Sequence, residues 1–392
     1  MKKFLKIIIL SYLLITLNTN ANSQNLYEST DESNNILKIG VLVPLSGKFK
    51  QIGKSVLQAI QLAVVDLNEP NVIIYPKDSK GNSNDAYFAA KEFENLGINI
   101  VIGPIFYENL KKINKINNIT FISLTNTNQN LPNEIIAFGI NFESQLEAIT
   151  QYLIKKKIEK TILLLPESEF GLQIEPIIQN HKFKFYKTYH YNANPEKITA
   201  EIEKITNYKQ RKINLNARVK ILEKSDLEKD KRELEKLKEQ YTLGKVDFTS
   251  VVIADFGERL KSVLASFTFT DISHEKVKFF TLNHWFDESL FNEESSQNLF
   301  FPGIDLKNFN KFRKRYYQKF NEPATEISIL AYDALGLIYF LWNENKFNIK
   351  TEKFFSRDGF KGLQGEFKIK NNSSYQKLEM YKISEKKFVI AD

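Results

Sequence analysis

The chain has 392 residues, a formal charge of +8 and no cysteine. This length predicts two domains or one large domain, with enough buried surface to need no covalent crosslinks. The absence of cysteine excludes a disulfide framework, a thiol nucleophile and a lipid-modified N-terminal cysteine. The positive charge is spread along a lysine-rich chain and does not form the stripe that nucleic-acid binding requires, so we expect no nucleic-acid partner.

The N-terminus has the pattern of a signal peptide. Met1 to Lys6 is basic, and Ile7 to Leu17 is apolar but shorter than the ~20 residues of a spanning helix. We expect residues 1–23 to be removed on export to the periplasm, which lowers the formal charge to +5, and residues 24–35 to be a polar leader. A retained N-terminal anchor is the alternative. No later segment is apolar enough to span a membrane.

From residue 36 the sequence alternates short apolar runs with amphipathic stretches. Apolar runs predict strands that are buried on both faces of a parallel sheet, and residues at helical spacing predict the covering helices. Strands are expected at 39–43, 72–75, 98–102 and 120–123, with helices at 54–67, 83–93 and 107–117. We expect Ser83 or Asn84 to cap the second of these helices. The rhythm predicts right-handed crossovers in an open sheet.

The same rhythm then starts again and predicts a second α/β lobe. Helices are expected at 144–157, 172–180, 308–320 and 327–342, and strands at 161–165, 183–189, 251–254, 277–281 and 299–301. The tail, 365–369 and 378–383, is expected to form a hairpin. We assign residues 36–140 and 303–355 to lobe 1, and 141–302 and 356–392 to lobe 2. The fold class is thus α/β, with two Rossmann-like lobes and a hinged cleft between them.

Residues 201–245 interrupt this pattern with a segment rich in Lys and Glu, which predicts a charged helical hairpin inserted in lobe 2. The run Ser225-Asp226-Leu227-Glu228 fits a capping box at the start of its second helix. A narrow apolar seam follows, made of Leu227, Leu234, Leu237 and Tyr241. Such a seam fits either a solvated decoration or an arm that a partner helix completes.

Motifs for catalysis and for cofactors are missing or misspaced. Gly53-Lys54-Ser55 lacks the spacing of a phosphate loop, because five residues separate it from Gly47 where four are needed. The four histidines show no i, i+4 metal pair, and no Gly-x-Ser-x-Gly elbow occurs. We therefore expect no metal, no cofactor and no enzymatic activity.

Polar and aromatic residues instead follow the predicted strands, where open α/β sheets bind ligands. Hydroxyls and free N–H groups suit a carboxylate, an aspartate suits an ammonium group, and aromatic rings enclose an apolar part. Each residue alone is also a common turn former, so the signal is their joint placement. The candidate ligand-binding residues are Ser46, Gly47, Asp78, Tyr107, Thr125, Asn126, Thr127, Phe170, Asp255, Trp285 and Asp287.

The order of these motifs resembles the type I periplasmic binding proteins, the leucine/isoleucine/valine-binding group. The resemblance is carried by residues 39–47, Val101-Ile102-Gly103-Pro104, Phe121-Ile122-Ser123, Glu169-Phe170-Gly171 and Ala331-Tyr332-Asp333-Ala334. It covers nearly all of residues 36–392. It implies two Rossmann-like lobes, three crossovers and a hinged cleft.

The sequence departs from the amino-acid binders within the implied pocket. Phe106, Tyr107 and Glu108 stand where the resemblance implies serine, Asn126 stands before Thr127 in place of a small residue, and Phe170 replaces a tyrosine. The charged insertion, followed by residues 244–248 and a strand, looks like the penicillin-binding protein activator branch, although the best-known members of that branch carry a lipid anchor.

These features leave two functional hypotheses, with an enzyme as a third that has no visible catalytic residues. The first is a regulator whose partner is a cell-wall synthase, a penicillin-binding protein. The second is the solute receptor of an ABC permease, which would bind a small amino-acid-like ligand. Both imply a periplasmic protein that closes its lobes or displays a surface.

Overall fold

The computed structural model describes residues 36–127, 131–132, 134–282, 285–346, 349 and 351–392. The predicted signal peptide and polar leader lie outside these residues. No helix among the described residues combines the length and the apolar character that crossing a bilayer requires.

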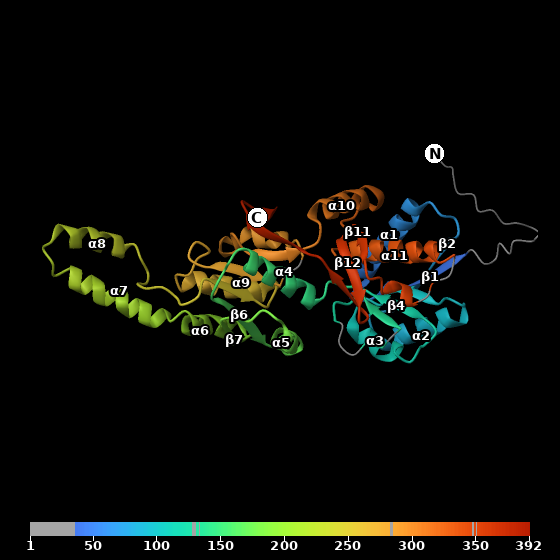
Figure 1. Cartoon of the computed structure of the whole chain (residues 1–392), viewed down its shortest axis with the longest axis horizontal. Helices are drawn as coiled ribbons and strands as arrows, with labels where there is room; N and C mark the ends of the chain where they lie inside the picture. The colour runs from blue at the N-terminus through green and yellow to red at the C-terminus, as the bar shows by residue number, and fades with distance from the viewer. Residues whose placement is uncertain (1–35, 128–130, 133, 283–284, 347–348, 350) are drawn as a thin grey trace, which may run out of the picture. The chain divides into compact units, whose positions relative to one another are not determined.

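Lobe 1 is an eight-stranded sheet covered by helices (Figure 1). Its strands are β1 (Leu37–Val43), β2 (Val72–Asp78), β3 (Ile100–Ile102), β4 (Thr120–Ser123), β5 (Ile135–Ala137), β11 (Phe360–Gly362), β12 (Gly365–Lys370) and β13 (Ser373–Gln376). Its helices are α1 (Lys50–Leu67), α2 (Ser83–Asn95), α3 (Tyr107–Ile113), α10 (Leu306–Phe320) and α11 (Ser328–Glu344).

Lobe 2 is a seven-stranded sheet with its own helices. Its strands are β6 (Thr161–Glu167), β7 (Lys187–Asn192), β8 (Ser250–Ile253), β9 (Lys278–Thr281), β10 (Phe300–Gly303), β14 (Glu379–Ser384) and β15 (Lys387–Ile390). Its helices are α4 (Phe142–Lys155), α5 (Glu169–Asn180), α6 (Pro195–Ile205), α7 (Tyr208–Leu222), α8 (Glu228–Lys238) and α9 (Gly257–Phe269).

The parallel parts of the two sheets have the same strand order, 2-1-3-4-5 in lobe 1 and 7-6-8-9-10 in lobe 2. In each sheet the order reverses beside the first strand of the lobe, which creates the switch point where α/β sheets bind ligands. The chain passes between the sheets three times, after β5, after β10 and after β13. The predicted fold of two α/β lobes is confirmed.

The tail is divided between the lobes, and our assignment of residues 356–392 to lobe 2 is wrong for its first half. β12 and β13 form an antiparallel hairpin around Asn371 and Asn372, and β13 extends the lobe 1 sheet beside β5 (Figure 1). β14 joins the lobe 2 sheet beside β10 and pairs with β15. The predicted hairpin between 365–369 and 378–383 is therefore also wrong. The residues of the tail strands gave no indication of which sheet each strand joins.

Two of the interlobe crossings are held together by a buried polar network. Asn141, which is wholly buried, donates to Ser373 Oγ (3.0 Å) and to the Ser374 carbonyl (2.7 Å), and its side-chain oxygen caps α4. Gln376 N donates to Ser144 Oγ (3.0 Å). At the remaining crossing, Tyr381 Oη donates to the Ile304 carbonyl (3.0 Å). Because the hydrogen bonds of Asn141 and Gln376 join chain segments from both lobes, this network connects the crossings after β5 and β13.

The helix that follows the first strand of each lobe approaches the end of that strand too closely for a side chain. A Cβ on Gly53 of α1 would lie 1.8 Å from the Pro44 carbonyl oxygen, and one on Gly171 of α5 would lie 1.9 Å from the Pro166 carbonyl oxygen. The glycine of Gly53-Lys54-Ser55 is thus required for packing. The cap of α2 is Asn82, whose side chain accepts from the N–H groups of Asn84 and Asp85, so the predicted caps are one or two residues too late.

The insertion forms a helical hairpin of α7 and α8, which we call the arm (Figure 1). Its interior consists of Leu215 and Leu222 from α7 against Leu234 and Leu237 from α8. The predicted seam is correct for these two α8 leucines, but Leu227 and Tyr241 are exposed. The seam is closed within the arm, so a partner helix is not needed to complete it.

The predicted capping box at the start of α8 is also wrong. The N-cap is Leu227, and Ser225 Oγ instead accepts from the Leu227 N–H (3.3 Å) and donates to the Asp230 carboxylate. The hydroxyl therefore shapes the turn before the helix. Sequence spacing alone does not separate these two uses of a serine.

Candidate functional site

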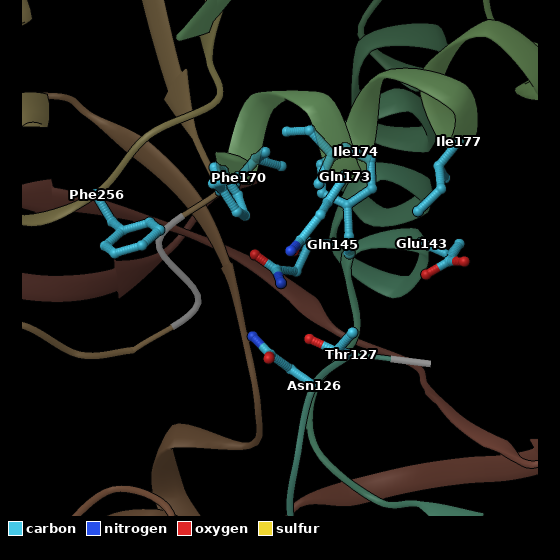
Figure 2. A pocket seen from close by; sticks show the side chains of 11 residues that line it. Asn126, Thr127, Glu143, Gln145, Phe170, Gln173, Ile174, Ile177 and Phe256 are labelled. Carbon is cyan, nitrogen blue, oxygen red and sulfur yellow. The ribbon is translucent and has the colours of Figure 1, made fainter. Parts of the chain in front are cut away.

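A small pocket lies between the loops of the two lobes, and three of the candidate residues line it. We call it the Phe170 pocket (Figure 2). Asn126 and Thr127 follow β4 in lobe 1, while Phe170 lies in the first turn of α5 after β6 in lobe 2. Figure 2 shows Asn126 and Thr127 opposite Phe170 and the glutamine side chains of α4 and α5. The structure therefore brings together residues 44 positions apart in the sequence, as their placement after strand ends predicted.

The Phe170 pocket has polar groups that sequence reasoning missed. Gln145 from α4 is buried, its Nε2 donates to the Asn141 carbonyl (3.2 Å), and its Oε1 has no hydrogen-bond partner among the described residues. Phe256, which follows β8, packs edge-to-face on Phe170 with ring centroids 5.4 Å apart. A glutamine in the first turn of an amphipathic helix gave no sequence signal, whereas Phe256 directly follows the candidate Asp255.

Size and charge restrict what the Phe170 pocket can hold. Its volume is about 90 Å³, well below the ~300–1,000 Å³ of typical ligand sites. Among the residues that the structure describes, Glu143 is the one charged side chain in its lining, so this described lining offers no cation to a ligand carboxylate. The free Gln145 oxygen can accept from an N–H donor. The pocket suits a small neutral or cationic group better than a free amino acid.

A larger pocket of about 650 Å³, which we call the Trp285 pocket, contains two further candidates. Trp285 and Asp287 come from the loop after β9, and Phe106 and Ile105 come from the loop after β3. Asp287 Oδ1 accepts from the Ser289 N–H (2.9 Å) and caps a short 3₁₀ helix, so one carboxylate oxygen is committed to the backbone. Aromatic rings and a carboxylate therefore face the same space.

The Trp285 pocket is acidic overall. Arg313 Nη1 pairs with Glu288 Oε1 (3.2 Å), which leaves Asp287 and Glu326 as its remaining acids. Burial, with a smaller contribution from the negative charge of Asp287, raises the pKa of Glu326 to about 6. Carboxylates beside Trp285 and Phe106 suit an organic cation, which both charge and ring faces attract. Glu326 was not predicted, because it lies in a loop before α11 and follows no strand.

Asp255 does not lie in either pocket. Its side chain is wholly buried and accepts from Tyr191 Oη (2.6 Å), Arg259 Nε (2.8 Å) and the Phe256 N–H (2.9 Å). Burial and the nearby Asp255 carboxylate raise the pKa of Tyr191 above its ordinary value, which keeps the phenol a donor. The carboxylate is fully used by the protein, so the interpretation of Asp255 as a ligand for an ammonium group finds no support in this geometry.

Ser46 and Asp78 are close together but bind each other. Ser46 Oγ donates to Asp78 Oδ2 (2.6 Å), and the Leu45 N–H donates to Asp78 Oδ1 (2.7 Å). Partial burial opposes ionisation of Asp78, but hydrogen bonds from Ser46 and from the N–H groups of Lys80 and Leu45 outweigh it and hold the pKa of Asp78 below its ordinary value. This pair joins the ends of β1 and β2.

The last three candidates lie outside the lining of both pockets. Thr125 is buried and its Oγ1 accepts from the Thr127 N–H (3.2 Å), so it shapes the loop that carries Asn126 and Thr127. Tyr107 begins α3 and packs against a cluster of lobe 1 apolar residues. Gly47 has φ +70° with open space around its Cβ position, which identifies it as a turn residue.

The family comparison agrees with this architecture. Residues 36–207 match the family model described as periplasmic binding protein. Solved structures of branched-chain amino-acid binding proteins are similar to this chain over most of its length. One, the ligand-binding protein of an ABC transporter from Burkholderia xenovorans, has a TM-score of 0.66 and 13% identity and covers 91% of this chain and 94% of its own. The chain has the type I periplasmic binding protein fold. The resemblance predicted from the sequence is confirmed.

Neighbours of this fold have different roles. LivJ from Streptococcus pneumoniae, a branched-chain amino-acid transporter protein solved with isoleucine, has a TM-score of 0.55 and 16% identity, covering 90% of this chain and 97% of its own. The C-domain of LpoA from Haemophilus influenzae, a regulator of PBP1A, has a TM-score of 0.62 and 14% identity, covering 91% and 100%. No curated protein sequence matches the chain. At these identities the likeness establishes the fold alone.

Proposed function

We propose that this protein is a non-catalytic periplasmic regulator that binds a cell-wall synthase, a penicillin-binding protein. The observation that carries the proposal is the Phe170 pocket, whose volume of about 90 Å³ is small for a free amino acid and whose lining among the described residues carries one charged side chain, the acid Glu143. A solute receptor that closes on a free amino acid needs a partner for each charged group of that ligand, because a buried charge without one is costly. The C-domain of LpoA, a regulator of PBP1A, has the same fold, which also supports a regulatory function for this chain.

The test is a reconstituted synthase reaction. Residues 36–392 would be added to the purified bifunctional penicillin-binding proteins of the same cell, with glycan polymerisation and peptide crosslinking followed separately. We expect saturable binding to one of these synthases and a change in one of its two rates. Absence of both binding and rate change for every synthase of the cell would refute the proposal.

The second candidate is the receptor of an ABC permease for a small solute. It is favoured by the unpartnered Gln145 oxygen and by the acids and aromatic rings of the Trp285 pocket, which suit a ligand with an amino or guanidino group. Such a ligand at one hundred times its Kd would stabilise the protein by about 2.7 kcal/mol. Thermal melts with amino acids, short peptides and diamines test this candidate, and no shift with any of them would exclude it.

A further inference from the structure

The outer face of α7 carries positive charge without compensating acids. Its exposed residues Lys209, Lys212 and Lys220 lie on one side of the helix, because their spacings are close to whole turns. None of the three takes part in an ion pair among the described residues. No acidic residue occurs between Glu203 and Glu223.

This side of α7 also exposes apolar surface. Ile213 is 58% exposed and Ile221 is 61% exposed, while the other large aliphatic residues of α7 pack toward α8. We call Lys209, Lys212, Ile213, Lys220 and Ile221 the α7 outer face. On α8, by contrast, Lys231 and Lys238 pair with glutamates one turn before them, so much of the charge on that helix is neutralised internally.

The arm holds this face in a fixed position. Arg211 is buried at the base of the arm, where Nε donates to the Thr206 carbonyl (3.0 Å) and Nη1 donates to Thr242 Oγ1 (2.8 Å). Further out, Arg218 binds both carboxylate oxygens of Glu233 across the hairpin (2.8 and 2.7 Å). A face that is already ordered loses little conformational entropy on binding, which favours a role in recognition.

We infer that the α7 outer face docks a protein partner whose contact surface is acidic around an apolar centre. The three lysines require negative charge on the partner's contact surface, because charges across an interface are complementary. The two exposed isoleucines would contact an apolar part of that surface. A lipid surface fits less well, because interfacial helices bury a broad apolar face and the leucines of α7 are used inside the arm. The inference concerns the arm alone and does not depend on which protein the partner is.

The absence of cysteine allows a site-specific test. The variant I213C would be labelled with a benzophenone maleimide and illuminated with an envelope extract of the cells that make the protein. K311C on the exposed side of α10, a helix that is equally free of acids, is the control position. We expect an adduct from position 213 that K311C does not give, and we expect its crosslinked peptide to lie in a segment with excess Asp and Glu.

Charge variants decide whether the contact is specific. K209E/K212E/K220E in the I213C background should lower the adduct yield about tenfold or more, since complementary charge controls encounter. K307E/K311E/K314E on α10, with the same change in net charge, should leave the yield unchanged; circular dichroism confirms folding of both variants. No adduct, an adduct to lipid or to a non-acidic segment, or equal losses in the two variants would overturn the inference. An adduct to an acidic protein other than a synthase would uphold the inference, while the proposed function would still be decided by the reconstituted synthase reaction.

Discussion

Variants of the Asp255 network test whether Asp255 stabilises the folded protein or binds a ligand. Asp255 is wholly buried and accepts from Tyr191, from the Phe256 N–H and from Arg259. Asparagine offers one acceptor oxygen where the carboxylate has two, so D255N loses at least one charge-assisted hydrogen bond. Such bonds contribute about 1.5–3 kcal/mol each, and we expect D255N to lower the free energy of unfolding by about 3 kcal/mol.

The reciprocal variant R259M leaves the buried carboxylate without its cation and should cost about 3–5 kcal/mol. Urea unfolding followed by circular dichroism measures both variants and their double mutant, whose loss should fall short of the summed single losses by about 1–3 kcal/mol. Folded D255N should bind its partner or solute with unchanged affinity. A D255N loss below about 1 kcal/mol together with lost binding would show that Asp255 faces a ligand and that this reasoning is wrong.

Three further predictions test the arm, the Trp285 pocket and the helix–strand contact. R211M removes the hydrogen bonds of the buried guanidinium at the base of the arm and should cost about 1.5–3 kcal/mol in urea unfolding, with faster amide exchange in α7 and α8; an unchanged exchange pattern would contradict the role of Arg211 in holding the arm. Because burial raises the pKa of Glu326 from 4.5 to about 6, its contribution to stability is present below pH 4.5 and lost as pH rises through 6. The wild type should therefore lose about 2 kcal/mol more than E326Q between pH 4 and pH 8, and equal losses in urea unfolding would refute this assignment. G53A should lower stability by about 1–3 kcal/mol through its clash with the Pro44 carbonyl, whereas G336A in the open part of α11 should not, and similar melting temperatures for the two variants would contradict the packing argument.

The sequence predicted the fold well because the signal was repeated in every unit. Buried strands such as 39–43 are continuous apolar runs, and helices such as α1 show apolar residues at helical spacing, so most elements were visible without knowledge of their neighbours, although β5, α6 and α9 were not predicted. The strand pairing of the tail was not predicted correctly. Contacts with β13, β5 and β10 determine which sheet β12 and β14 join, and the residues of β12 and β14 alone do not.

The site was predicted only in part for a related reason. Residues that follow strands converge on the same edge of a sheet, which is why Asn126, Thr127 and Phe170 meet in one pocket. The sequence does not show whether a polar residue faces a pocket or a neighbouring side chain. Asp255 is taken by Arg259 and Tyr191, although its position after β8 matched that of a ligand residue. Conversely, Gln145 reaches the pocket from the first turn of α4, a position that follows no strand of the predicted sheet.

The central claim is that the protein acts by contact with a partner and does not carry an amino acid. Native mass spectrometry of the protein gently purified from its own envelope tests this claim most directly, because it weighs bound solute and bound protein in one spectrum. The account predicts the mass of the chain alone and of its complex with a cell-wall synthase. A dominant species heavier by one amino acid, with no synthase complex, would contradict it.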